Sequence, residues 1–200
     1  MVRSNLLARY YLWMEYQVFQ NKLITARQSF FSHIRPDSRI LIVGGGIGTE
    51  LSGLNQLLPG TRVDFVDHSP SMILRARKQP QAYLEVGYYS TLDEILQYRY
   101  DHIFFHFFLD LYSQTDVECF LRKAMGLLYS HGKISVVDFQ YSSAVKNLLI
   151  RIMYLVYRSF VPTAASCLPD FYSAYQKCGL SIEQERQLEG RMIMAHQLKQ

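Results

Sequence analysis

The residues best suited to do chemistry in this sequence are three alternating glycines and one acid further along the chain. Gly44, Gly46 and Gly48 end an aliphatic run and lead into Thr49, and Asp67 ends the next apolar run, nineteen residues after Gly48. A glycine turn between a strand and a helix lets the backbone approach a ligand closely. An acid at the tip of the neighbouring strand suits the hydroxyls of a ribose. The pattern therefore predicts a site for a nucleoside-containing cofactor.

The spacing of the glycines discriminates between cofactors. A dinucleotide fingerprint needs G-x-G-x-x-G, and this chain has Thr49 where the third glycine would stand. The sequence also lacks the G-x-x-x-x-G-K-[ST] loop that cradles nucleoside triphosphates. A nicotinamide dehydrogenase is therefore disfavoured. Two simpler interpretations stay open: the glycines as a plain strand-to-helix turn, and Asp67 as an acid that caps a helix.

Five segments, in chain order, resemble the motifs of the class I S-adenosylmethionine-dependent methyltransferases. The resemblance extends over about residues 25–200 and is closest to the small-molecule enzymes of ubiquinone and menaquinone biosynthesis. It implies an enzyme that uses S-adenosylmethionine to methylate a small apolar or aromatic acceptor, with O- or C-methylation favoured. The segments are the glycine turn (40–50), a strand with acid and helix (63–78), the fourth strand (100–113), a helix that ends in a His-Gly turn and is followed by the fifth strand (124–140), and a closing helix with two strands (170–200).

The same resemblance implies an α/β fold. We expect a Rossmann-like, doubly wound sheet of seven mostly parallel strands, with an antiparallel C-terminal hairpin and helices on both faces. The 200 residues suffice for one stable core, and we expect one methyltransferase domain over 1–200. Its parts would be an N-terminal helical cap (1–36), a cofactor-binding core (37–140), a substrate-side helical segment (141–170) and a closing helix with hairpin (171–200).

Carried over residue by residue, the resemblance also assigns the cofactor site. Asp67 would accept the ribose hydroxyls, and His68 would lie near the adenine. The expected cofactor-binding residues are Gly44, Gly45, Gly46, Gly48, Asp67, His68, Met72, Tyr88, His106 and Phe107. We expect no metal site.

One histidine near the end of the fourth strand is the candidate catalytic residue. Ligands of open α/β sheets bind outside the carboxyl ends of the strands, and His106 interrupts an apolar run at that point. A neutral imidazole can take the proton of a hydroxyl or acidic carbon as the methyl group arrives. A histidine buried as part of the core is the simpler interpretation. Tyr112, Asp138 and Tyr141 are weaker candidates, and an acceptor that is already ionised needs no base.

Two positions depart from the family pattern. Most members carry an acid two residues before the first glycine, where this chain has Ile42. Many place an aspartate after the third strand, at the adenine amino group, where this chain has Tyr88. A methyltransferase-fold subunit that has lost its cofactor therefore stays open as an alternative. An aminopropyltransferase also stays open, although the acid-rich segments expected after its fourth strand are absent.

Composition and charge restrict the partners. Hydrophobic residues make up 49% and charged residues 19% of the chain, which is typical of a globular protein. The net charge of +4 is spread without runs of Lys or Arg, so we expect no nucleic-acid partner. Three cysteines without metal-ligand spacing favour reduced thiols and a cytoplasmic location.

The segment between the fifth strand and the closing helix is apolar and helical in pattern. Asn147, Arg151 and Arg158 fall on one stripe, and most other positions are aliphatic or aromatic. Embedded arginines and a length of about 17 residues argue against a membrane span. An apolar wall here favours a greasy or aromatic acceptor. Burial against the sheet, a homodimer interface and peripheral contact with a membrane stay open for the same face.

Overall fold

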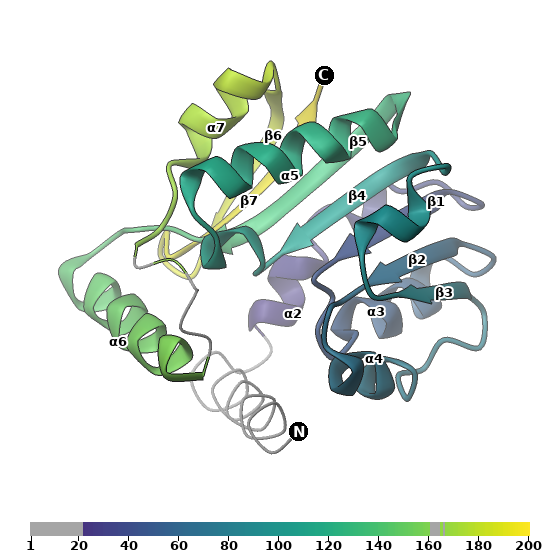
Figure 1. The fold of residues 1–200 in the computed structure, drawn as a ribbon, viewed down its shortest axis with the longest axis horizontal. Coiled ribbons are helices and arrows are strands. Elements are labelled where there is room, and N and C mark those ends of the chain that lie inside the picture. Colours follow the sequence, from purple (N-terminus) through teal and green to yellow (C-terminus); the bar gives the residue numbers. More distant parts are fainter. Residues whose placement is uncertain (1–21, 161–164, 166) are drawn as a thin grey trace.

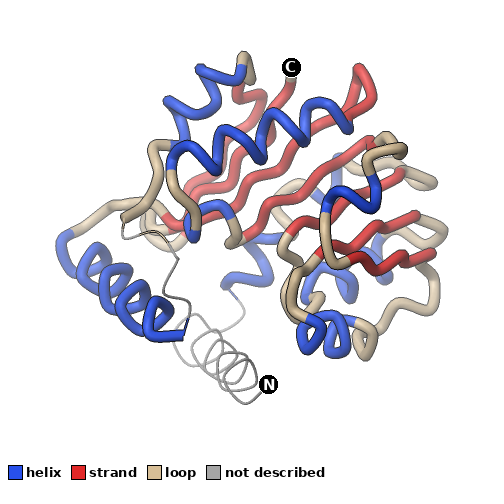
Figure 2. Tube along the Cα trace, viewed as in Figure 1, coloured by secondary structure: helices blue, strands red, loops and turns tan. Residues whose placement is uncertain are grey.

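The protein is built on one seven-stranded sheet (Figures 1 and 2). The computed structural model describes residues 22–160, 165 and 167–200. The strand order is β3-β2-β1-β4-β5-β7-β6, with β7 antiparallel to both of its neighbours and the other pairs parallel. The predicted fold, including the C-terminal hairpin, is therefore confirmed.

The described elements follow the order expected from the sequence. They are α2 (Lys22–Arg27), η1 (Phe31–His33), β1 (Arg39–Val43), α3 (Thr49–Leu57), β2 (Arg62–Val66), α4 (Pro70–Ala76), β3 (Glu85–Tyr89), η2 (Leu92–Ile95), β4 (Tyr100–His106), η3 (Leu109–Leu111), α5 (Gln114–Leu127), β5 (Leu128–Phe139), α6 (Ala144–Phe160), α7 (Phe171–Cys178), β6 (Ser181–Leu188) and β7 (Ile193–Lys199).

The register of the central strands brings distant residues to one edge of the sheet. Val43 of β1 is level with Val66 of β2 and with Phe105 of β4. The residue that follows each of these, Gly44, Asp67 and His106, therefore emerges at the same carboxyl edge.

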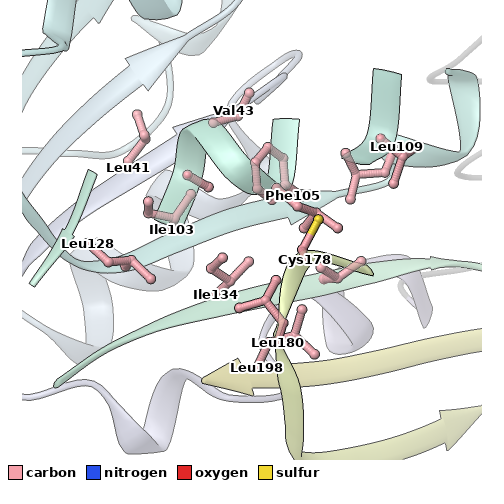
Figure 3. Packing of buried hydrophobic residues seen from close by; sticks show 14 of the residues in the cluster. Leu41, Val43, Ile103, Phe105, Leu109, Leu128, Ile134, Cys178, Leu180 and Leu198 are labelled. Carbon is pink, nitrogen blue, oxygen red and sulfur yellow. The ribbon is translucent and has the colours of Figure 1, made fainter. Parts of the chain in front are cut away.

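Helices cover both faces of the sheet, as an apolar sheet requires. On one face α5 and α7 pack over the alternate side chains of the strands, and Figure 3 shows Ile103, Phe105 and Ile134 in this layer. On the other face α3 and α4 cover β1 and β2. A second cluster on that face joins α2 and α6 to the ends of β5 and β7. These three clusters hold the carboxyl edge in place.

The passage from α5 to β5 differs from the sequence-based expectation of a helix that ends in a His-Gly turn. The helix ends at Leu127, and His131 and Gly132 lie within β5. The pairing of β4 with β5 shifts between Tyr100 and His102, which leaves extra residues of β5 as an irregularity in the ladder. A glycine at such a bulge resembles a turn in the sequence, which explains the error.

The expected N-terminal cap is described in part. Residues 1–21 lie outside the described residues. Of the rest of the 1–36 segment, α2 and η1 both pack on the sheet. In the part of the chain that the structure describes, no helix is long and apolar enough to cross a bilayer.

Candidate functional site

The glycine turn has the backbone conformation that its sequence predicts. Gly44, Gly46 and Gly48 have φ angles of 68°, 57° and 78°. Side chains with a Cβ rarely adopt this left-handed region. The N–H of Gly44 donates to the carbonyl of Val66 over 2.9 Å, which ties the turn to β2. Gly48 then stands at the N-cap of α3.

One glycine of the turn leaves its backbone open to a ligand. A Cβ on Gly46 would meet nothing within 4 Å, whereas a Cβ on Gly45 would strike the ring of Phe65. At Gly44 the ring of Phe108 lies where a Cβ would be. The turn therefore fits a ligand that approaches Gly46, and packing against aromatic rings explains Gly44 and Gly45.

Asp67 is hydrogen-bonded to the glycine turn. Its Oδ2 accepts the N–H of Gly46 over 2.9 Å, and its Oδ1 accepts the N–H of Ser69 over 2.8 Å. Burial raises the pKa of Asp67, and the two backbone N–H groups and His68 oppose that rise. Each carboxylate oxygen keeps a further lone pair for another donor. The acid and the turn thus form one site.

The other predicted cofactor residues lie around this acid with different exposure. His68 is exposed and Met72 is half-buried. Tyr88 lies on the neighbouring strand β3, level with Phe65. Its hydroxyl donates to Gln81 over 2.6 Å, and its ring lies 4.3 Å below the guanidinium of Arg77. Burial raises the pKa of Tyr88.

His106 emerges at the carboxyl edge, but its side chain is buried beneath the first turn of α3. The ring is stacked on Phe104 with 4.8 Å between centroids, and Nε2 lies 2.9 Å from the hydroxyl of Ser135. Nδ1 lies 3.3 Å from a carboxylate oxygen of Glu50. Burial lowers the pKa of His106, against the opposing effect of Glu50, so the imidazole is neutral near pH 7.

A buried ion pair beside His106 was not predicted from the sequence. Arg27 Nη1 lies 2.7 Å from Glu50 Oε1, and the two side chains are 6% and 1% exposed. Burial alone would raise the pKa of Glu50, but Arg27 and His106 lower it to about 2. An acid in the first turn of a helix usually indicates favourable interaction with the helix dipole. The sequence offered no sign that Glu50 faces inward.

The chain leaves β4 through a strained residue. Phe107 has a φ of 53°, which is unusual for a side chain with a Cβ. Its N–H donates to the carbonyl of Val137 over 2.7 Å, and its ring lies 4.8 Å from the guanidinium of Arg27. Backbone strain of this kind gathers at functional sites. Phe107 packs on the side of the edge that faces α2 and α6. The ring of the next residue, Phe108, lies on the side of Gly44.

Asp138, a weaker candidate for the catalytic base, is completely buried beside a second acid. Its Oδ2 accepts the N–H of Asp110 over 3.1 Å. The hydroxyl of Tyr154 in α6 lies 3.1 Å from Asp110 Oδ2 and donates to the Asp110 carbonyl over 2.7 Å. Asp110 was also missed in the sequence, although a lone acid between two leucines was a visible signal.

Cys119, Cys167 and Cys178 are all free thiols. Within residues 22–160, 165 and 167–200, no three His, Cys, Asp or Glu side chains are gathered so that they could hold a metal ion.

The arrangement of the chain is that of known methyltransferases. Mitomycin 7-O-methyltransferase superposes with a TM-score of 0.69 at 15% identity, over 90% of this chain and 54% of that one. The magnesium protoporphyrin IX methyltransferase of Synechocystis PCC 6803, solved with bound SAH, superposes with a TM-score of 0.67 at 17% identity, over 90% and 82%. An O-methyltransferase family 2 protein of Planctomyces limnophilus, in complex with apigenin, gives 0.64 at 14% identity, over 84% and 55%.

These comparisons establish the fold. The chain spans about half the length of the mitomycin enzyme, with 54% of that protein covered. No protein-family model and no curated protein matches the chain by sequence.

Proposed function

We propose that this protein transfers a methyl group from S-adenosylmethionine to a small apolar or aromatic acceptor. The observation that carries the proposal is the hydrogen bond from Gly46 to Asp67, which joins the glycine turn and the acid into one site. It lies at the carboxyl edge of a methyltransferase-fold sheet, where ligands of open α/β sheets bind.

The residues around Gly46 and Asp67 have the chemistry to hold this cofactor. S-adenosylmethionine, when bound, supplies an activated methyl group on a sulfonium. The carboxylate of Asp67 is suited to the ribose hydroxyls, and the open backbone at Gly46 allows close approach. His68, Met72 and the ring of Tyr88 would surround the adenine. Phe107 would border the methyl group on the acceptor side.

The acceptor class rests on the apolar cluster beside the edge. Phe107, Phe139, Met153 and Tyr154 are buried together there, between α2, α6 and β5. Apolar and aromatic side chains beside the cofactor edge favour an apolar or aromatic molecule over a sugar or nucleotide. Methyltransferases of the same fold are named for mitomycin and for magnesium protoporphyrin IX, and one was solved with apigenin. We therefore favour O- or C-methylation of an aromatic acceptor.

A base at the end of β4 would assist a hydroxyl acceptor. His106 is the candidate that the sequence predicts, and its neutral imidazole has the right protonation state. To act as the base, its ring would have to leave Ser135 and Glu50, which it now contacts.

Calorimetric titration with S-adenosylmethionine and S-adenosylhomocysteine tests the proposal. We expect micromolar binding to the wild type, weakened about tenfold to a hundredfold in Asp67→Ala because a charged hydrogen-bond acceptor is lost. Asp93→Ala is the matched control, since that acid is an exposed surface residue whose side chain is 75% exposed. Asp67→Asn keeps the shape of the side chain if Asp67→Ala does not fold.

The alternatives give different results in the same titration. Binding of decarboxylated S-adenosylmethionine in preference to the intact cofactor would indicate an aminopropyltransferase. A folded wild type that binds none of these compounds would overturn the enzyme proposal and favour a partner subunit.

The outer face of α6 supports a further contact. Val145, Leu148, Ile152 and Leu155, which define this face, are 79%, 59%, 49% and 74% exposed. Their spacing places them on one side of the helix. We propose that this face meets a second copy of the chain or a membrane surface, in a cytoplasmic protein whose three thiols are free. Light scattering and co-sedimentation with lipid vesicles distinguish the two, with Leu148→Gln as the test variant and Leu74→Gln on α4, 63% exposed, as its control.

A further inference from the structure

Two carboxyl groups that belong to different elements meet at the carboxyl edge. Asp138 is the penultimate residue of β5, and Asp110 lies in η3, just after β4. They are 0% and 4% exposed, and each carboxyl group shifts the pKa of the other, so the two groups lie side by side. Both oxygens of Asp138 accept backbone N–H groups, from Asp110 over 3.1 Å and from Phe139 over 3.0 Å. Asp138 is therefore held rigidly, with Asp110 against it.

One oxygen of this pair has no partner. Asp110 Oδ1 is buried and makes no hydrogen bond, whereas Oδ2 lies 3.1 Å from the hydroxyl of Tyr154. An orphaned buried carboxylate oxygen costs free energy, because it has lost water and gained nothing. An oxygen without a partner at the carboxyl edge of the sheet points to a ligand that supplies the missing hydrogen-bond donor.

The carboxyl pair lies beside the glycine turn of the proposed cofactor site, where its oxygens could accept a hydrogen bond from a ligand. His106 of β4 is level with Val137 of β5, so Phe107 and Asp138, the next residue of each chain segment, follow at the same edge. The chain from Phe107 to Tyr112 then runs across the edge. Phe108 packs on Gly44, and burial, followed by the charge of Asp67, raises the pKa of Tyr112. One short segment thus links the carboxyl pair to both parts of the proposed cofactor site.

The two carboxyl groups behave as one titrating unit. Burial raises the pKa of Asp110 to about 6, although hydrogen bonds from Asp138 and Tyr154 oppose the rise. Burial and the adjacent Asp110 raise the pKa of Asp138 well above its ordinary value. The pair therefore holds one proton and one negative charge near pH 7. Tyr154 of α6 and Tyr175 of α7 are the other titratable groups that interact with it, and Tyr141 interacts with Tyr154.

We propose that Asp110, supported by Asp138 and Tyr154, is the catalytic base that removes the proton of a hydroxyl acceptor. This inference rests on the proposed function. The O–H bond of the acceptor breaks and a new O–H bond forms at Asp110 Oδ1. The electron pair stays on the acceptor oxygen, which becomes the nucleophile for the methyl group. Asp138 is a positioning residue, because it keeps its own proton and directs it at Asp110.

Carbon-13 NMR of protein labelled at the aspartate carboxyl carbons tests the pair without any substrate. We expect one carboxyl that titrates near pH 6 and a second that keeps its proton to higher pH. Asp110→Asn should move the titration of Asp138 to lower pH, because the neighbouring negative charge is gone. Tyr154→Phe should raise the pKa of Asp110, and Asp93→Asn should change neither. Two aspartates that are both ionised at pH 7, or that titrate independently, would overturn the proposal.

Methyl transfer to catechol and 2-naphthol, with tritiated S-adenosylmethionine, then tests the role of Asp110 as the base. We expect Asp110→Asn to lower kcat by about a hundredfold or more near pH 7, with unchanged affinity for S-adenosylhomocysteine. Activity should recover at a pH where the acceptor ionises without help. If Asp110→Asn is as active as the wild type and His106→Gln is inactive, His106 is the base and the proposal fails.

The two proposals fail in different ways. If the wild type binds neither S-adenosylmethionine nor S-adenosylhomocysteine, the proposed methyltransferase function is overturned, whatever the NMR titration gives. A wild type that binds the cofactor but has uncoupled aspartates overturns only the role of Asp110.

Discussion

The guanidinium of Arg27 lies 2.7 Å from the carboxylate of Glu50, and the surrounding protein excludes nearly all water from both. Arg27 belongs to α2 and Glu50 to the first turn of α3, directly after the glycine turn. Arg27 also reaches the carbonyl of His106 over 3.3 Å. One cation therefore joins the N-terminal helix, the start of the cofactor-side helix and the end of β4.

Glu50→Gln should strongly destabilise the fold. Removing one charge leaves Arg27 buried without its counter-ion, which typically costs about 3–5 kcal/mol. Urea unfolding followed by circular dichroism measures the change. Glu85→Gln removes the acid of the exposed Arg62–Glu85 pair and should leave the free energy of unfolding nearly unchanged. If the two substitutions changed the free energy of unfolding equally, burial of the Arg27–Glu50 pair would not explain its effect.

Acid should unfold the protein in two pH windows. Burial lowers the pKa of His102 to about 4 from its ordinary 6.5, so the unfolded chain binds this proton first. Stability is then lost as the pH falls from 6.5 toward 4. The pKa of Glu50 is lowered from 4.5 to about 2, so its contribution is present above pH 4.5 and is lost as the pH falls through 2. Thermal melts at stepped pH should show His102→Gln less sensitive in the upper window, with His68→Gln, whose side chain is exposed, as control.

Gly46→Ala should weaken cofactor binding more than it weakens the fold. The new methyl group would enter the open space in front of the turn, at a φ of 57°. Gly179→Ala, at the C-cap of α7, is matched in conformation with a φ of 74° and also has nothing within 4 Å of the new Cβ. Each should cost about 1–2 kcal/mol in stability. Only Gly46→Ala should reduce the affinity for S-adenosylhomocysteine in calorimetry, and equal affinities would remove Gly46 from the site.

Tyr88 should contribute to cofactor affinity through its ring. Stacking of a base on an aromatic side chain is worth about 1–3 kcal/mol, so Tyr88→Ala should weaken S-adenosylhomocysteine binding at least about fivefold. Tyr88→Phe should bind almost as well, because it loses only the hydrogen bond to Gln81. Tyr83→Ala removes a tyrosine that is 66% exposed and serves as control. A loss in Tyr88→Phe as large as in Tyr88→Ala would assign the effect to the hydroxyl.

The parts of the fold that were predictable are those set by local chemistry. The aliphatic run before Gly44 and the left-handed turn after it follow directly from residue types, as does the helix stop at Gly179. The strand end at Asp67 is equally local. The His131–Gly132 turn was wrong because a glycine inside an irregular strand has the same sequence signature as a glycine in a turn.

The buried polar groups at the carboxyl edge of the sheet were not predictable, because their partners are distant in sequence. Glu50 meets Arg27 across 23 residues, and Asp110 meets Asp138 across 28. The spacing of apolar residues indicates which face of a helix or strand is buried. A single acid that points inward leaves that spacing unchanged. His106 is the last residue of β4, near the strand end where the sequence places it, whereas the direction of its side chain depends on α3.

The charged edge strand β6 has a consequence for how molecules of this protein associate. The strand carries Glu183, Glu185 and Arg186, and Glu183 is already paired with Lys133 over 2.7 Å. A strand of another molecule that tried to extend the sheet there would have to desolvate these charges, which is how native sheets resist edge-to-edge aggregation. Association between copies would therefore be disfavoured at this end of the sheet, whereas the exposed apolar side chains on the outer face of α6 could leave water without desolvating a charge.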